Sequence, residues 1–368
     1  MSTIVKIAAL TALFSVSAVI ALEPPAHHEQ RAYTNPFATA KQGGFFGIIR
    51  ARLSKQWQVY DPVRDRVPTA TPDLVAAGEA STNATVTWVG HATVLIQHQG
   101  INVLTDPMFS EYASPVSFAG PKRVSKPAVA IAQLPPIHAV VISHNHYDHL
   151  DIATIQQLGN DPVYFVPLGL GPWLQARGIA TTQIREMDWW QEDAIRVEGQ
   201  ELQVTATPSQ HFSGRGLFDR NKTLWASWRL GWNDFQTWFG GDTGYNAQQF
   251  KEIGARLGPF DLGIIPIGAY EPRWFMSTVH VNPEEALLIH RDIGAQSSMG
   301  IHWGTFVLAG EGVLTPPAAL ATARQRQGMD AEDFVAFAVG ETRHYESKLK
   351  QTSPAKPTTA SLSLQRSR

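Results

Sequence analysis

Short runs of apolar and β-branched residues recur from Thr85 onward, and several of them end at a histidine or an aspartate. Turn residues separate these runs, and three longer stretches between them have helical character. Because strand-like runs outnumber helical ones, the pattern predicts an α/β domain whose sheets are covered by helices. The expected strands are 85–90, 92–98, 101–107, 139–143, 163–167, 201–209, 236–241, 262–268 and 298–304, with a hairpin turn at Gln99-Gly100. The expected helices are 151–158, 245–257 and 282–294.

The run at 139–143 is followed by an unusual concentration of nitrogen and oxygen donors. Three histidines and one aspartate occupy six consecutive positions: His144, His146, Asp148 and His149. Only 13 histidines occur among the 368 residues, so chance explains this grouping poorly. Three later runs end at His211, Asp242 and His302. A lone histidine is usually an ordinary polar residue, but donors at several strand ends lie on loops held by a rigid sheet, where metal and active sites are usually built.

These seven donors exceed the needs of one metal ion, because a catalytic zinc takes three protein ligands and keeps one position open. The chain contains no cysteine, which excludes disulfides and thiolate ligands and leaves His, Asp and Glu to hold any metal. We therefore expect two ions. The first would be held by His144, His146 and His211, the second by Asp148, His149 and His302, with Asp242 as a bridging carboxylate.

The N-terminus has the order of regions typical of a secretory signal peptide. Lys6 precedes an apolar stretch at 7–20, and Ala21 offers a small residue for processing ahead of Pro24. We expect residues 1–21 to be a signal peptide and the protein to be exported, to the periplasm or to a membrane. An uncleaved anchor is the alternative, because the apolar stretch approaches the ~20 residues that a membrane span needs.

An N-terminal extension, 22–84, precedes the first strand run and is irregular except at 43–57. Four large apolar residues recur there at helical spacing, with basic residues between them: Phe46, Ile49, Leu53 and Trp57. Such an amphipathic helix lies either on a membrane surface or on the protein's own core, and the second is slightly favoured. The main domain is expected at 85–345, and residues 346–368, which lack apolar periodicity, are expected to be a disordered tail.

The donor pattern resembles the metallo-β-lactamase fold superfamily, whose signature is an HxHxDH loop followed by a later His, Asp and His. Longer runs resemble one family within it, the phospholipases D that hydrolyse N-acyl-phosphatidylethanolamine. The more specific of these runs are GAYEPRWFM at 268–276 and IHWGTF at 301–306, and the similarity covers about 85–345. The resemblance implies an α/β fold of the αββα type, two mixed β-sheets covered by helices, with two zinc ions (Zn2+) per chain held by the seven donors.

The resemblance also implies roles for individual residues. Tyr147 and His280 would contact the substrate, and Asp148 and His280 would take part in catalysis. Asp106, in LTDP, is expected to orient a ligand histidine from behind, a role that metal sites generally need filled; a turn residue before Pro107 is the equal alternative. His91 is expected at most to line the pocket, because the metal count is complete without it.

Two adjacent metal ions activate water and stabilise oxygens during displacement at phosphorus. We therefore expect a phosphodiesterase that hydrolyses N-acyl-phosphatidylethanolamine or a related phospholipid at a membrane surface, to phosphatidate and the head-group alcohol. A metal-dependent lactonase or another hydrolase of a small substrate would use the same donors. A non-enzymatic metal-binding protein would need the open metal position blocked. A nuclease is disfavoured, because a formal net charge of −2 provides no overall field for nucleic acid. Homodimer formation stays open.

Overall fold

The computed structural model describes residues 24–37, 50, 58–75, 83–216 and 218–346. The expected signal peptide, all of the expected helix at 43–57 except Arg50, and the expected tail from residue 347 lie outside the described residues. None of the helices in the described part of the chain has the length and apolar character that crossing a bilayer requires.

The described residues form two mixed β-sheets of seven strands each. The first sheet contains, in spatial order, β14 (Thr342–Tyr345), β1 (Ala84–Gly90), β2 (Thr93–His98), β3 (Ile101–Thr105), β4 (Ala139–Val141), β5 (Val163–Pro167) and β6 (Ile184–Met187). The second contains β13 (Phe334–Ala336), β12 (Ala295–Ile301), β11 (Phe260–Pro266), β10 (Gln236–Phe239), β9 (Ser227–Gly231), β8 (Gln200–Thr207) and β7 (Glu192–Val197). Strands β3 to β6 and β10 to β13 pair in parallel, and the others are antiparallel.

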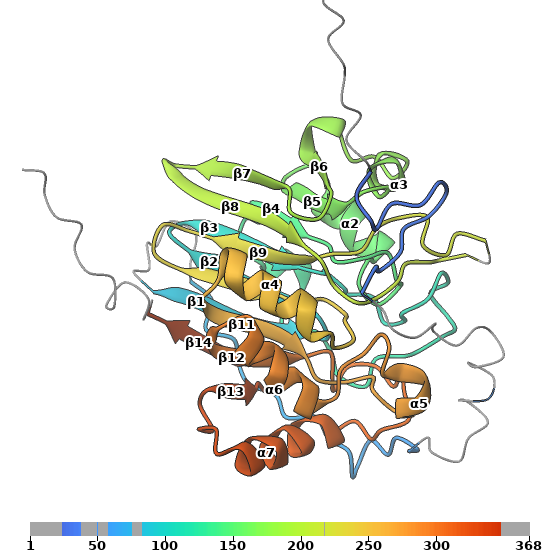
Figure 1. Cartoon of the computed structure of the whole chain (residues 1–368), viewed down its shortest axis with the longest axis vertical. Helices are drawn as coiled ribbons and strands as arrows, with labels where there is room; N and C mark the ends of the chain where they lie inside the picture. The colour runs from blue at the N-terminus through green and yellow to red at the C-terminus, as the bar shows by residue number, and fades with distance from the viewer. Residues whose placement is uncertain (1–23, 38–49, 51–57, 76–82, 217, 347–368) are drawn as a thin grey trace, which may run out of the picture.

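Helices cover the outer faces of both sheets (Figure 1). On the first sheet these are α2 (Ile152–Leu158) and α3 (Gly171–Gln175), and on the second α4 (Ala247–Leu257), α6 (Pro283–Asp292) and α7 (Thr315–Gln327). The short α5 (Arg273–Met276) lies in the connection between β11 and α6. The predicted αββα sandwich is therefore confirmed.

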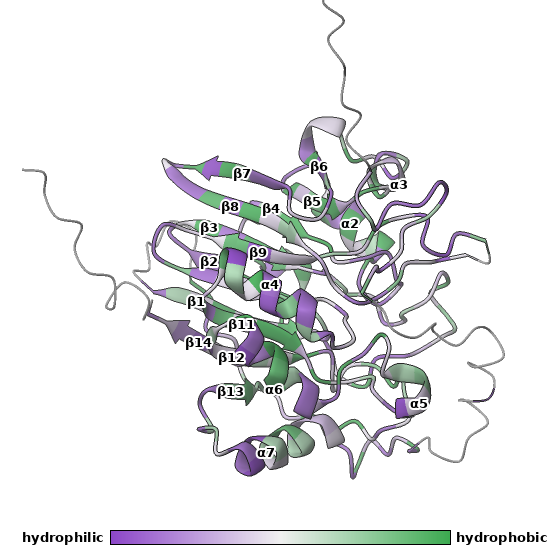
Figure 2. Ribbon diagram, in the orientation of Figure 1, coloured by the Kyte–Doolittle hydropathy of each residue, from purple (hydrophilic) through white to green (hydrophobic). Residues whose placement is uncertain are grey.

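Strands buried on both faces explain why the layers form. In β2, Val94 and Ile96 belong to the large core between the sheets, whereas Leu95 between them belongs to a second core with Ile155 of α2. Side chains alternate across a strand, so a continuous apolar run supplies both cores at once. In Figure 2 the green, apolar colour runs along β11 and much of β8, whereas α4 and α7 carry both purple and green turns.

The nine expected strands and three expected helices are all present, with shifts of a few residues at their ends. The hairpin turn is confirmed too, because Gln99 and Gly100 both have the positive φ that a two-residue connection requires. The sequence reading missed β6, β7, β9, β13, β14, α3, α5 and α7. Several of these strands are short and half-exposed at sheet edges, so their apolar pattern is weak. In α7, two prolines resemble a helix breaker, yet they occupy the first turn, where proline is tolerated.

One side chain links the two sheets directly beside the donor loop. Trp228 of β9 is fully buried in the core between the sheets. Its Nε1 donates a 3.0 Å hydrogen bond to the carbonyl oxygen of Ile142, two residues before His144. The second sheet thus fixes the backbone from which the first donors project.

We expect Trp228→Phe to lower the free energy of unfolding by about 1–3 kcal/mol, because the buried carbonyl of Ile142 loses its partner. Urea unfolding followed by circular dichroism measures the change. Trp274→Phe is the matched control, since Trp274 is 50% exposed. Equal shifts of the unfolding midpoint in the two variants would contradict the proposed link.

Candidate metal centre

The donors converge because strands that run in the same direction end at the same edge of their sheet. The strand ends at this edge are followed directly, or within four residues, by His91, Asp106, His144, His211, Asp242 and His302. The edges of the two sheets face each other there, so donors from both sheets meet. Gly241 permits the last turn before Asp242: its φ is +56°, and an added Cβ would lie 2.4 Å from the Cβ of Ser143.

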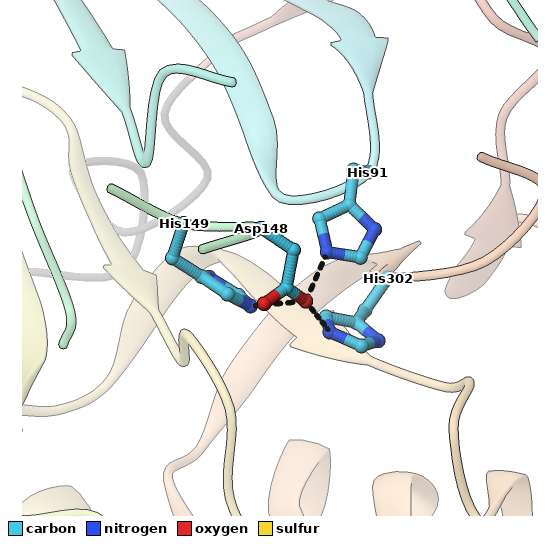
Figure 3. A group of neighbouring side chains, drawn as sticks. All are labelled: His91, Asp148, His149 and His302. Atoms are coloured by element: carbon cyan, nitrogen blue, oxygen red, sulfur yellow. Dashed lines mark hydrogen bonds and ion pairs between the residues drawn. The ribbon is translucent and has the colours of Figure 1, made fainter. Parts of the chain in front are cut away.

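The structure brings the seven predicted donors together in two adjacent groups. One consists of His144, His146, His211 and Asp242, and the other of Asp148, His149, His302 and His91; within each, the candidate ligand atoms lie within 4.8 Å of one another. Figure 3 shows the second group, in which three imidazoles surround the carboxylate of Asp148.

Asp242 contacts histidines of both groups. Its Oδ2 lies 3.8 Å from Nε2 of His144 and 3.7 Å from Nε2 of His211. The same oxygen lies 3.2 Å from Nε2 of His149, and Oδ1 lies 3.1 Å from Nε2 of His302. A carboxylate in this position, with 3% of its residue surface exposed, can supply a ligand atom to either donor group.

Asp106 is completely buried behind the second group. Its carboxylate accepts hydrogen bonds from the backbone N–H of Ser143 at 2.6 Å and from the Ser143 hydroxyl at 2.5 Å. It also lies 2.6 Å from Nδ1 of His149, which directs the opposite ring nitrogen, Nε2, toward Asp242. This geometry matches the expected orienting carboxylate, because a ligand histidine is held by a partner on its other nitrogen.

Two further rings are oriented in the same way. Nδ1 of His144 lies 2.8 Å from the Ser143 hydroxyl, and Nδ1 of His211 lies 2.9 Å from the carbonyl oxygen of Val279. In both cases Nε2 is left to face the centre. The donors are therefore positioned by contacts that lie outside the centre itself.

Several buried polar atoms at the centre make no well-oriented hydrogen bond to the described residues, even where a carboxylate or an imidazole lies as close as 3.1 Å. They are Nε2 of His149, both ring nitrogens of His302, and Oδ1 of Asp242. Buried polar groups are normally satisfied, and exceptions call for an explanation such as an ion. The donor set, rich in imidazole and carboxylate, suits zinc. These residues therefore fit the metal that the fold implies.

The electrostatics point the same way. Burial lowers the pKa of His211 to about 3 and of His146 to about 4, so these rings are neutral and available as ligands. At His302, burial also favours the neutral ring, but the carboxylates of Asp242 and Asp148 together outweigh it and raise the pKa to about 9. The centre thus attracts positive charge, either as protons or as a metal ion that displaces them.

His91 is the residue whose position the sequence reading underestimated. The prediction treated it as no more than pocket lining, but its Nε2 lies 2.9 Å from Oδ2 of Asp148. Its ring centroid is 4.1 Å from that of His302, and it is 1% exposed. Figure 3 shows His91 entering the group from the end of β1. The available signal was its place at a strand end, like the other donors.

The backbone at these positions is strained. His91, Asp106 and His302 all have positive φ, at +56°, +31° and +64°. Such conformations are uncommon outside glycine, and they cluster at functional sites, where the surrounding structure holds them. At His91 the holding contacts are visible: its carbonyl oxygen accepts hydrogen bonds from Nε1 of Trp88 at 2.9 Å and from the backbone N–H of His302 at 3.0 Å.

The two residues assigned to the substrate occupy different surroundings. His280 is buried, its ring lies 5.1 Å from that of His211, and its Nδ1 has no partner among the described residues. It forms a further candidate group with Asp242 and His302, so it lies at the centre itself. Tyr147 is half-buried and turns toward the connection between β8 and β9. There its hydroxyl donates a hydrogen bond to the carbonyl oxygen of Arg215 at 2.9 Å.

We expect His91→Asn to weaken metal binding by about 10- to 100-fold, the usual cost of losing a contact that orients a metal ligand. Asparagine tolerates positive φ, so the fold should survive. Zinc competition against a chromophoric chelator measures the affinity. His98→Asn is the control, because His98 forms a similar buried pair with Asp234, 2.8 Å apart, at the opposite end of β2. Unchanged zinc affinity in His91→Asn would show that the contact with Asp148 is dispensable.

Comparison with known proteins agrees with this structure. A family model described as a β-lactamase superfamily domain matches residues 101–303, more than half of the chain. An N-acyl-phosphatidylethanolamine-hydrolyzing phospholipase D 1 of Caenorhabditis elegans is 44% identical over 226 residues, which are 60% of this chain and 64% of that protein. The mitochondrial enzyme of the same description from Saccharomyces cerevisiae is 36% identical over 234 residues, 62% of this chain and 49% of that one. This chain thus matches less than two thirds of the length of either relative.

Among solved structures, an isothiocyanate hydrolase from Delia radicum gut bacteria has a TM-score of 0.56 at 19% identity, covering 71% of this chain and 99% of that one. That similarity supports the fold alone. The resemblance to N-acyl-phosphatidylethanolamine-hydrolysing phospholipases D is confirmed by the relatives from Caenorhabditis elegans and Saccharomyces cerevisiae. The chain belongs to the β-lactamase superfamily.

Proposed function

We propose that the chain is a two-zinc phosphodiesterase that hydrolyses N-acyl-phosphatidylethanolamine or a related glycerophospholipid, giving phosphatidate and the head-group alcohol. The observation that carries the proposal is the position of Asp242, whose two carboxylate oxygens contact histidines of both donor groups. When bound there, two zinc ions supply activated water and a Lewis acid for displacement at phosphorus.

The chain's own residues hold and complete this centre. Asp148 and Asp242 supply the anionic ligands, and Asp106 and His91 hold His149 and Asp148 in position. Burial lowers the pKa of His280 to about 3, so its imidazole is neutral near neutral pH. With Nδ1 unpartnered, that ring can exchange a hydrogen bond with an oxygen of the phosphodiester or of the leaving alcohol.

Contacts that lie outside the metal centre fix the position of His280. Nη1 of Arg273 donates to the carbonyl oxygen of His280 at 2.9 Å, and Nη2 of the same guanidinium pairs with Glu285 at 2.7 Å. Glu285 and Asn282 also form the capping box that begins α6. The backbone at His280 is therefore tied to a helix start, which suits a residue that must contact substrate with fixed geometry.

A lipid substrate is supported by the two matched relatives, which are both described as phospholipases D that hydrolyse N-acyl-phosphatidylethanolamine. Large apolar side chains are exposed on connections that follow strands ending at this edge: Phe118 at 78%, Phe218 at 85% and Trp274 at 50%. A contiguous exposed apolar patch marks contact with a membrane or an apolar ligand, and such a patch would be built on these three side chains. We therefore propose that the enzyme works at a lipid surface, after export directed by residues 1–21.

We expect Asp242→Ala to lose at least one equivalent of zinc relative to the unaltered chain, because both donor groups lose their shared ligand. Turnover should be abolished. Elemental analysis of zinc-loaded, desalted protein gives the difference in metal content. The surface variant Asp73→Asn should bind as much zinc as the unaltered chain, since the Asp73 side chain is 82% exposed. Unchanged zinc content in Asp242→Ala would contradict the assignment of Asp242 as a ligand shared by two ions.

We expect N-acyl-phosphatidylethanolamine in mixed micelles to yield phosphatidate and N-acylethanolamine. In H2(18)O the label should enter phosphatidate, because water attacks phosphorus and the alcohol leaves. Mass spectrometry reads both products. His280→Ala should reduce the rate without reducing metal content. Diacylglycerol or free fatty acid as product would show that a different bond is cleaved. Rapid turnover of a lactone, with no action on the lipid, would show instead that the chain is a metal-dependent lactonase.

A further inference from the structure

A third group of metal donors lies away from Asp242, where the N-terminal segment contacts the main domain. Nε2 of His27 lies 2.6 Å from Oδ1 of Asp188, and Nε2 of His28 lies 2.8 Å from Oδ2 of the same carboxylate. Asp188 lies in the connection between β6 and β7 and, like His27, is buried. The three candidate ligand atoms lie within 4.8 Å of one another.

Aromatic contacts hold both imidazoles in place. The His27 ring stacks on Trp189, with centroids 4.2 Å apart and planes at 26°. The His28 ring makes an edge contact with Tyr33, with centroids 5.3 Å apart and planes at 89°. Asp188 is fixed as well, because its Oδ1 accepts the backbone N–H of Trp189 at 2.8 Å. The donors therefore point at a common position before any ligand binds, which lowers the entropic cost of binding.

We propose that His27, His28 and Asp188 form a separate site for a divalent ion of the zinc class. Two imidazoles and one carboxylate are ligands of this class, and an ion bound by three residues keeps one position for water. Tetrahedral coordination at about 2.1 Å requires ligand atoms about 3.4 Å apart, so the rings would move outward by less than 1 Å. The main centre shows similar close spacing, since Nε2 of His144 and Nδ1 of His146 are 2.7 Å apart.

An ion at this site would fasten the N-terminal segment over the loop that carries His211. The backbone N–H of Tyr33 donates to the carbonyl oxygen of Asn221 at 2.8 Å. The side-chain amide of Asn35 donates to the carbonyl oxygen of Ser209 at 3.1 Å. Asn221 in turn donates its N–H to the carbonyl oxygen of Ser213 at 2.9 Å. The site would thus hold a segment against the loop that carries His211, and it contacts no residue assigned to the substrate.

The test compares zinc content across untagged full-length variants. We expect Asp188→Asn to lose one equivalent relative to the unaltered chain, with turnover retained, and Asp193→Asn, at a half-buried carboxylate in the adjacent strand, to lose none. The same loss should appear when Asp188→Asn is added to Asp242→Ala, which isolates this site from the main centre. Equal zinc content with and without Asp188→Asn in both backgrounds would overturn the proposal. The three side chains would then form hydrogen bonds without binding an ion.

A second measurement does not depend on stoichiometry. Arg31 is exposed between His28 and Tyr33, so trypsin cleavage there reports whether the segment is fastened. In the unaltered chain, zinc should slow this cleavage and a chelator should speed it. In His28→Gln and Asp188→Asn the rate should be fast and independent of zinc. Zinc protection that persists in both variants would assign the effect to the main centre and exclude this site.

Discussion

The two carboxylates Asp148 and Asp242 lie among imidazoles where the two sheets meet, and their negative charge has to be balanced there. Asp242 is 3% exposed and Asp148 has 14% of its side chain exposed, so water compensates little of the charge. Burying an unpaired charge is costly, and proteins solve this by pairing it or by coordinating a metal. Imidazoles balance the charge of these two carboxylates, and they reach the carboxylates from the ends of several strands.

The sandwich meets that requirement by its topology. Parallel strands in each sheet deliver their C-terminal ends to the same edge, and the apolar core between the sheets keeps those edges in register. Trp228 connects this core to the donor loop, because its Nε1 donates a hydrogen bond to the carbonyl oxygen of Ile142. The rigid part of the molecule therefore lies directly beneath the site, and the loops above it are free to differ in what they bind.

A second layer of contacts fixes the donors themselves. Asp106 holds Ser143 and His149, and His91 holds Asp148, each from a backbone position with positive φ. Strain of this kind persists because the surroundings impose it, and at a metal centre it orients ligands before the ion arrives. The N-terminal segment adds a comparable contact at Asp188, farther from the centre.

The sequence by itself determined the strand runs and the seven donors that follow their ends. These features are readable because strand burial and local donor spacing are properties of neighbouring residues. Only the tertiary structure decided that His91 contacts Asp148, 57 positions away, and that His27 meets Asp188, 161 positions away. It also decided the short edge strands, such as β7, whose exposure leaves little apolar pattern to detect. Such contacts depend on how distant loops are brought together by packing, and a single sequence carries no local signal for that.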